Sequence, residues 1–206
     1  MIPRGTALFI EPHGTLLEAL RERKAWLEQA MPGQAFCNHP PHCTLLFGSY
    51  GAPAEWLETL RENLSAQAAF ELEINNWQQF PHDALAGGGH TVAYRAHLTP
   101  ALAHLQQTVA DSLAPFVSVG PNIHPLANTK PFASSLRKYG FPFVGAHWIP
   151  HFTIGSPLIP PTDPLLAHLV SGSTRHRFIV QTVSVWRVVG DTHERLHELA
   201  LADTQS

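Results

Sequence analysis

The apolar positions of this chain follow two different periods in successive segments. In Phe70–Trp77 apolar and polar residues alternate, which is typical of a strand with one buried face. Leu102, Leu105, Val109 and Leu113 recur at three- and four-residue spacing, which predicts a helix with one apolar side. The two periods follow one another along most of the chain, so we expect a mixture of strands and amphipathic helices.

Turn and capping residues mark where these elements begin and end. Thr99-Pro100 and Asp163-Pro164, for example, each combine an N-cap residue with a proline at the first helical position. We expect strands at Thr6–Glu11, His42–Tyr50, Phe70–Trp77, Thr91–Leu98, from His151 onwards, within Arg177–Val189 and at Leu196–Leu201. We expect helices at Thr15–Ala30, after Pro53, from Pro100 to Leu113, at Ser134–Tyr139 and after Pro164. This order, with short links between strands, favours an α+β fold with mainly antiparallel sheets.

Two short segments, one in each half of the chain, have nearly the same sequence. Pro41-His42-Cys43-Thr44-Leu45 and Pro150-His151-Phe152-Thr153-Ile154 each place a histidine two residues before a threonine. In an extended strand, residues i and i+2 point to the same face. We therefore expect the histidine and threonine of each segment to project together, while the apolar residues between and after them pack in the core.

These side chains fit phosphodiester chemistry that needs no metal. One neutral imidazole can accept a proton from an attacking hydroxyl or water, and one imidazolium can donate a proton to the leaving oxygen. Threonine hydroxyls can donate hydrogen bonds to the non-bridging phosphate oxygens. His42, Thr44, His151 and Thr153 are therefore the candidate catalytic residues, and the sequence leaves open which histidine is the base and which the acid.

The paired segments resemble the two-histidine (2H) phosphoesterase superfamily, which includes cyclic nucleotide phosphodiesterases and the proteins named 2′-5′ RNA ligases. The family signature is histidine, any residue, threonine or serine, then a hydrophobic residue, present twice; His42-Cys43-Thr44-Leu45 and His151-Phe152-Thr153-Ile154 both match it. The resemblance implies two pseudo-symmetric lobes around a central cleft, each with a mainly antiparallel sheet, flanking helices and one motif. Residues 1–206 would form this single bilobal domain. The implied reaction is hydrolysis of a 2′,3′-cyclic phosphate or a 2′-5′ linkage in a small nucleotide or RNA end, without a cofactor.

The stretch 114–146 breaks the periodic pattern and is rich in proline and glycine, as many functional loops are. Its basic residues can contact phosphate, and aromatic residues in or just after it can stack on a base. The candidate substrate-binding residues are Lys130, Arg137, Tyr139 and Trp148, with Lys138 beside them. The alternative is a solvated loop with no binding role.

Two other functions fit parts of the sequence. A non-catalytic nucleotide-binding module would use the same motifs, although binding alone does not need a matched acid–base pair. A metal hydrolase could use His39 with His42 or His147 with His151, but the prolines around them disfavour the helical geometry common in such pairs, and no carboxylate has a matching spacing. A Ser-His-Asp hydrolase has no Gly-x-Ser-x-Gly motif to support it.

Composition narrows the possible partners. The net charge of −3 and the pI of about 6.5 argue against a long polynucleotide track, so we expect a small nucleotide or RNA end as substrate. Two cysteines, Cys37 and Cys43, are too few for a disulfide framework, which favours a reduced, cytoplasmic protein. No stretch reaches the length of an apolar membrane span. We expect a monomer with no membrane partner.

Overall fold

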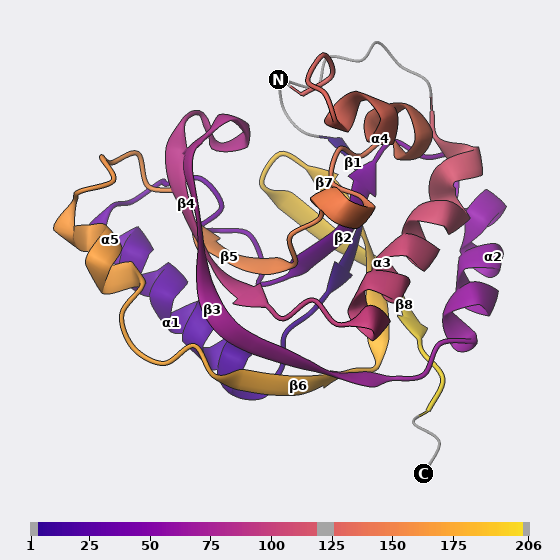
Figure 1. The fold of residues 1–206 in the computed structure, drawn as a ribbon, viewed down its shortest axis with the longest axis horizontal. Coiled ribbons are helices and arrows are strands. Elements are labelled where there is room, and N and C mark those ends of the chain that lie inside the picture. Colours follow the sequence, from indigo (N-terminus) through magenta and orange to yellow (C-terminus); the bar gives the residue numbers. More distant parts are fainter. Residues whose placement is uncertain (1–3, 119–125, 204–206) are drawn as a thin grey trace.

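The computed structural model describes residues 4–118 and 126–203 and has an α+β fold built on one antiparallel sheet of eight strands (Figure 1). The strands are β1 (Arg4–Ile10), β2 (Cys43–Gly48), β3 (Phe70–Asp83), β4 (Gly89–Ala96), β5 (His151–Gly155), β6 (His176–Val180), β7 (Thr182–Val189) and β8 (Thr192–Ala200). The helices are α1 (Gly14–Ala30), α2 (Pro53–Ser65), α3 (Pro100–Leu113), α4 (Phe132–Tyr139) and α5 (Pro164–Leu169). Within the two described ranges, no helix is long and apolar enough to span a membrane.

The sheet consists of two four-stranded halves that meet at a single residue pair. The strand order is β6-β3-β4-β5-β2-β1-β7-β8. Between β5 and β2, in the middle of this order, only Cys43 and Phe152 are paired, whereas β7 and β8 pair over their whole length. Each motif strand is therefore the inner strand of its own half, which agrees with the two-lobed fold expected from the sequence.

Helices cover one face of both halves. α1 packs on β5 and β6, α3 packs on β2, and α2 packs on α3 and β8. Leu16 and Leu20 of α1 and Trp56 of α2 have no exposed surface and belong to one core that extends under both halves. Cys43 and Phe152 are equally buried, which confirms that the residue after each motif histidine faces this core.

The sheet differs from the sequence prediction in β3, in the segment Arg177–Val189 and in β8, which begins at Thr192 and not at Leu196. β3 continues past Trp77 to Asp83 and includes Pro81. The β3–β4 register shifts between Phe80 and Asp83, so the proline lies at an irregularity where the strand needs no N–H donor. The β-prone segment Arg177–Val189 is divided at Gln181 into β6 and β7, which belong to different halves of the sheet.

Side chains replace part of the hydrogen bonding that a longer β2–β5 ladder would supply. The Trp148 indole N–H donates to the carbonyl oxygen of Thr44 at 2.9 Å. The Gln106 amide donates to the carbonyl oxygen of Leu45 at 3.3 Å. A buried carbonyl without a partner is costly, so these two side chains help to hold β2 where it separates from β5.

Lys24 ties the segment before the first motif to the second motif strand. Its buried ammonium group donates to the carbonyl oxygens of Phe36, at 2.6 Å, and Ile154, at 3.0 Å. Burial lowers the pKa of Lys24 to about 8, although the nearby Cys37 thiol acts in the opposite direction. Keeping the Lys24 ammonium group charged in the core therefore costs free energy, and this cost depends on pH.

We expect Lys24→Met to change how stability depends on pH. The folded-state pKa of about 8 lies below the ordinary 10.5, so between these values the unfolded chain holds a proton that the folded chain has released. The free energy of unfolding of the natural protein should therefore rise relative to the variant, by up to about 1.4 kcal/mol per pH unit across this window. Urea unfolding of both proteins from about pH 7 to 10 measures this difference. Lys130→Met, at an exposed position, should show no such trend, and parallel pH curves for the natural protein and Lys24→Met would contradict the prediction.

Candidate active site

The two motifs come together on the face of the sheet opposite to the helices, which we call the motif face. Cys43 and Phe152 form an antiparallel pair, and continuing this register sets His42 opposite Thr153 and Thr44 opposite His151. All four of these side chains are partly exposed. In this register His42 and His151 are diagonal neighbours that project from the same face.

The two histidines have the same local geometry. His42 Nδ1 lies 2.7 Å from the carbonyl oxygen of Pro40, and His151 Nδ1 lies 2.6 Å from that of Ile149. Because a carbonyl oxygen only accepts hydrogen bonds, Nδ1–H donates in both rings. Within the described part of the chain, both Nε2 atoms and both motif threonine hydroxyls lack a hydrogen-bond partner, so all four groups are available to a ligand.

His42 lies among aromatic and basic side chains. Its ring stacks on Phe9 of β1 with a centroid distance of 3.8 Å, and the His193 ring of β8 lies 6.0 Å away. His193 in turn contacts His39 at 4.4 Å. Burial lowers the pKa of His42 to about 3, and the basic groups His193, Lys24 and His39 act in the same direction, whereas its backbone hydrogen bond opposes them. This imidazole is therefore neutral at pH 7 in the free protein.

His151 has different electrostatic surroundings. Its ring contacts Phe80 of β3 at a centroid distance of 5.0 Å. Burial lowers the pKa of His151 as well, but the hydrogen bond to the Ile149 carbonyl, together with the Asp83 carboxylate, opposes this effect. The two motif histidines thus share a geometry, but basic groups add to the lowering of the His42 pKa, whereas the Asp83 carboxylate opposes it at His151.

The predicted substrate-binding residues differ in their exposure. Lys130 and Arg137 are exposed, just before α4 and on α4. Residues 119–125 of the predicted loop 114–146 lie outside the described residues. Substrate binding by Lys130 and Arg137 stays a prediction.

Tyr139 and Trp148 are buried, and their polar atoms are already bonded. The Tyr139 hydroxyl donates to Asp111 at 3.1 Å and accepts from Lys138 at 2.7 Å, and Tyr139 is 9% exposed. Trp148 is 6% exposed and donates to the backbone of β2, as described above. These contacts indicate that both rings support the framework, and their stacking on a base stays a prediction without geometric support.

Three residues that the sequence analysis did not single out lie beside the motif histidines. Phe9 belongs to a continuous apolar run, so its position on the motif face gave no periodic signal. His193 shares no repeated pattern with the other histidines. Arg95 pairs directly with His151, and a charged residue within the otherwise apolar end of a strand was a signal that could have identified it.

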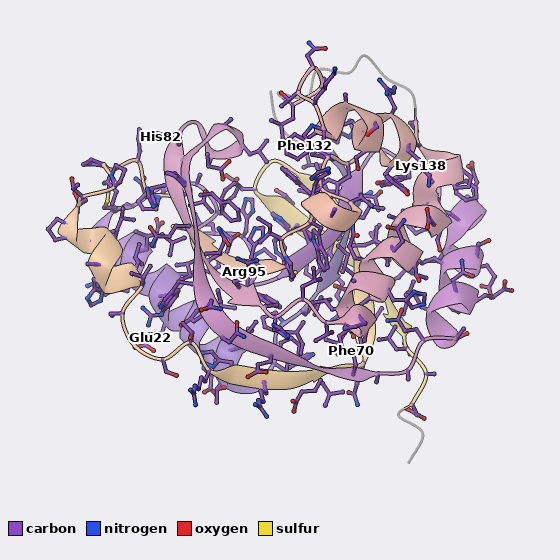
Figure 2. The ribbon with its side chains drawn as sticks, in the orientation of Figure 1. Glu22, Phe70, His82, Arg95, Phe132 and Lys138 are labelled. Carbon is purple, nitrogen blue, oxygen red and sulfur yellow. The ribbon has the colours of Figure 1, made fainter. Side chains whose placement is uncertain are left out.

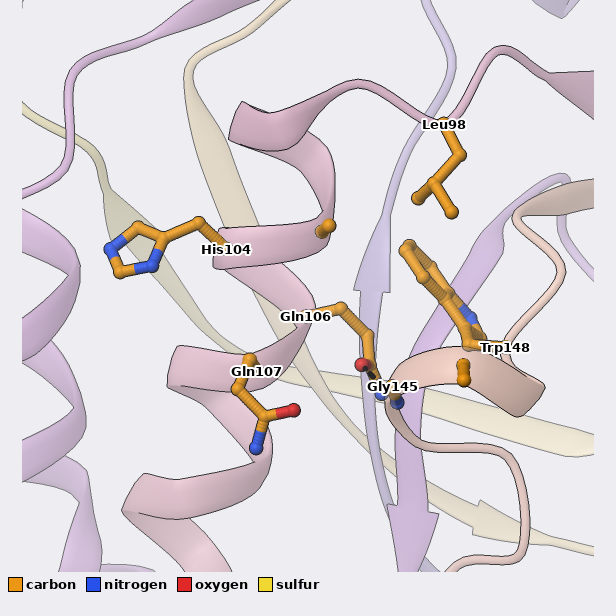
Figure 3. A pocket seen from close by; sticks show the side chains of 8 residues that line it. Leu98, His104, Gln106, Gln107, Gly145 and Trp148 are labelled. Atoms are coloured by element: carbon orange, nitrogen blue, oxygen red, sulfur yellow. Dashed lines mark hydrogen bonds between the residues drawn. The ribbon is translucent and has the colours of Figure 1, made fainter.

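A pocket of about 430 Å³ opens between α3 and residues 145–148 (Figure 3). It is lined by Leu98, Ala103, His104, Gln106, Gln107, Gly145, Ala146 and Trp148. Leu98 points toward Trp148, whereas His104 points away from it. None of the four motif residues lines this pocket, and its two members Gln106 and Trp148 hold the backbone of β2. It therefore belongs to the packing around the first motif strand.

The described ranges contain no side-chain cluster that matches the alternative of a histidine-ligated metal. No group of three or more histidine, cysteine, aspartate or glutamate side chains there has an arrangement that could hold a metal ion. His147 instead makes an edge contact with Phe132 at 5.6 Å. Both cysteines are free and buried, and burial raises the pKa of the Cys43 thiol to about 12, so this thiol is not a nucleophile at neutral pH.

Solved structures share this fold at low sequence identity. TT0787 of Thermus thermophilus has a TM-score of 0.63 at 14% identity, and the match covers 98% of this chain and 100% of that one. Escherichia coli LigT complexed with 3′-AMP has a TM-score of 0.56 at 13% identity, covering 97% and 98%. Kluyveromyces marxianus Usb1 with uridine monophosphate has a TM-score of 0.50 at 10% identity, covering 97% and 99%. No curated protein sequence matches the chain.

A family model adds sequence evidence to this likeness of fold. The model described as the 2′-5′ RNA ligase superfamily matches residues 8–192, a range that holds both motifs and most of the sheet. This match agrees with the resemblance seen in the two motifs. The chain therefore belongs to the 2′-5′ RNA ligase superfamily of two-histidine phosphoesterases.

Proposed function

We propose that this protein is a metal-independent phosphodiesterase that hydrolyses a 2′,3′-cyclic phosphate or a 2′-5′ phosphodiester in a small nucleotide or RNA end. The observation that carries this proposal is the pair of motif histidines on one face, each with Nδ1 bound to a backbone carbonyl and Nε2 free. The superfamily supports phosphoester chemistry. The 3′-AMP complex of LigT and the uridine monophosphate complex of Usb1 support a nucleotide as the substrate.

We assign the general base to His42 and the general acid to His151. Burial, with its basic neighbours acting in the same direction, lowers the pKa of His42 to about 3 and keeps Nε2 unprotonated, whereas at His151 the Ile149 carbonyl and the Asp83 carboxylate oppose the effect of burial on the pKa. A phosphate anion bound between the rings would raise the pKa of both, which brings them closer to the range useful for proton transfer. The pair would titrate as a coupled unit.

The proposed step conserves protons and electrons. His42 Nε2 takes a proton from water as the water oxygen attacks phosphorus. The bond from phosphorus to the leaving ribose oxygen breaks, and that oxygen receives the proton of His151 Nε2–H. Thr44 and Thr153 donate hydrogen bonds to the non-bridging oxygens, where negative charge increases in the transition state.

We expect His42→Ala and His151→Ala each to lower kcat on a nucleoside 2′,3′-cyclic phosphate by roughly 10²–10⁴, the usual contribution of one general acid or base. Thr44→Ala and Thr153→Ala should cost less, about ten-fold each, because one hydrogen bond is lost. Product formation followed by chromatography measures these rates, and circular dichroism checks that each variant folds. Full activity in either histidine variant would refute the mechanism. No turnover of any cyclic phosphate or 2′-5′ linkage by the natural protein would favour a non-catalytic nucleotide-binding module.

A substrate with a good leaving group separates the two histidine roles. p-Nitrophenolate leaves without protonation, so on a nucleoside p-nitrophenyl phosphate His151→Ala should lose at most about ten-fold. His42→Ala should keep its large defect, because water must still be deprotonated. Absorbance of the released p-nitrophenolate gives both rates. The reverse pattern, with only His42→Ala restored, would exchange the two assignments.

We expect turnover to be unaffected by removal of divalent metal. The proposed step uses imidazoles and hydroxyls only, and the described residues offer no metal-holding cluster. Rates before and after dialysis against a chelator should agree within error. A loss of activity that zinc or manganese restores would show that a metal takes part.

A further inference from the structure

Arg95 is an exposed cation on an otherwise buried strand. Every other residue of β4 is buried. Arg95 pairs directly with His151 on β5, and directly opposite residues of an antiparallel pair point to the same face. The guanidinium group therefore projects from the motif face beside the second motif histidine, near the middle of the molecule (Figure 2).

The positive charge of Arg95 has no carboxylate partner within the described ranges. Its polar contact is with Gln78 Oε1, at a long 3.4 Å between exposed groups. Three other arginines of the sheet, Arg177, Arg187 and Arg195, are paired with acids, for example Arg177 with Glu71 and Glu73. A guanidinium group with most of its N–H donors unused is well suited to bind a phosphate oxygen pair.

The register places Arg95 beyond His151, on the side away from the first motif. Across β2, β5, β4 and β3, the motif face carries in order Thr44, His151, Arg95 and Asn76. Neighbouring strands lie about 4.8 Å apart. The reacting phosphate would lie between β2 and β5, and Arg95 lies one strand farther along, on β4.

We propose that Arg95 binds a second phosphate of the substrate, located one ribose away from the reacting phosphate. This inference rests on the proposed function, because it takes the reacting phosphate to lie between the motif histidines. The substrate is then a nucleotide with a phosphate on each side of the ribose. Examples are a 5′-phosphorylated nucleoside 2′,3′-cyclic phosphate and the last nucleotide of an RNA chain that ends in a 2′,3′-cyclic phosphate. A single cation at this position binds one neighbouring phosphate. Binding of only one further phosphate agrees with the acidic net charge of the chain, which offers no long cationic track.

Two substrates that differ only in the second phosphate test this inference. They are adenosine 2′,3′-cyclic phosphate and its 5′-phosphorylated form. The natural protein should have a kcat/KM about ten-fold higher for the 5′-phosphorylated form, the usual value of a charge-assisted hydrogen bond. Arg95→Gln should remove this preference, because it lowers kcat/KM for the 5′-phosphorylated substrate about ten-fold more than for the single-phosphate substrate. Arg95→Lys should keep part of it, since it retains the charge without the planar fork.

Arg177→Gln is the matched control, because it removes an exposed, ion-paired arginine of the same sheet and should keep the full preference. The inference is overturned if the natural protein treats both substrates alike, or if Arg95→Gln lowers kcat/KM equally for both. Equal loss would place Arg95 on the reacting phosphate or in the framework.

A binding measurement separates this inference from the proposed function. Calorimetry compares adenosine 3′,5′-bisphosphate with 3′-AMP for the natural protein and Arg95→Gln. If neither cyclic phosphate is turned over, the proposed reaction fails, but tighter binding of the bisphosphate by the natural protein and not by Arg95→Gln still upholds the second phosphate site. Equal affinities for the two ligands in the natural protein overturn it.

Discussion

The pair Cys43–Phe152, where the two half-sheets meet, determines where the motif side chains point. Both members are fully buried, so their sequence neighbours His42, Thr44, His151 and Thr153 must project to the opposite face. The strands then separate, and the side chains of Trp148 and Gln106 bond to backbone carbonyls of β2, while Lys24 bonds to the Ile154 carbonyl of β5. A polar framework inside the core thus fixes the relative position of two imidazoles that lie outside it.

Two copies of one motif can perform two different tasks only if residues outside the motif distinguish them. Here the local structure is the same in both copies, down to the hydrogen bond between Nδ1 and the carbonyl two residues earlier. The difference comes from the neighbouring strands and loops, which bring His39, His193 and Lys24 near one ring and Asp83 near the other. Environments that separate the protonation equilibria of two similar groups are a general basis for acid–base pairs.

The features that could be predicted from the sequence are those with a local signal. Alternation and capping residues predicted the helices and most strands to within a few residues, although β3 is longer than expected. The alternation of side chains along a strand also predicted the burial of Cys43 and Phe152. The partners of each strand had no such signal: β6 and β7 are separated by Gln181 alone, yet they join different halves. Arg95 became a neighbour of His151 only through this long-range pairing. Tyr139 lies in the basic segment and Trp148 lies just after it, which suggested that both bind substrate. Their polar atoms are instead hydrogen-bonded inside the protein, and the composition of the segment does not reveal these contacts.

The path of the chain between the two halves limits how the molecule can move. β1 and β2 lie in one half, β3 to β6 in the other, and β7 and β8 return to the first. α1, which connects β1 to β2, packs on β5 and β6, and α3, which precedes β5, packs on β2. Domain closure bends a protein at a few hinge residues, but here several crossings would have to bend together. These crossings therefore oppose a rotation of one half against the other, and the relative position of the two imidazoles is established when the chain folds.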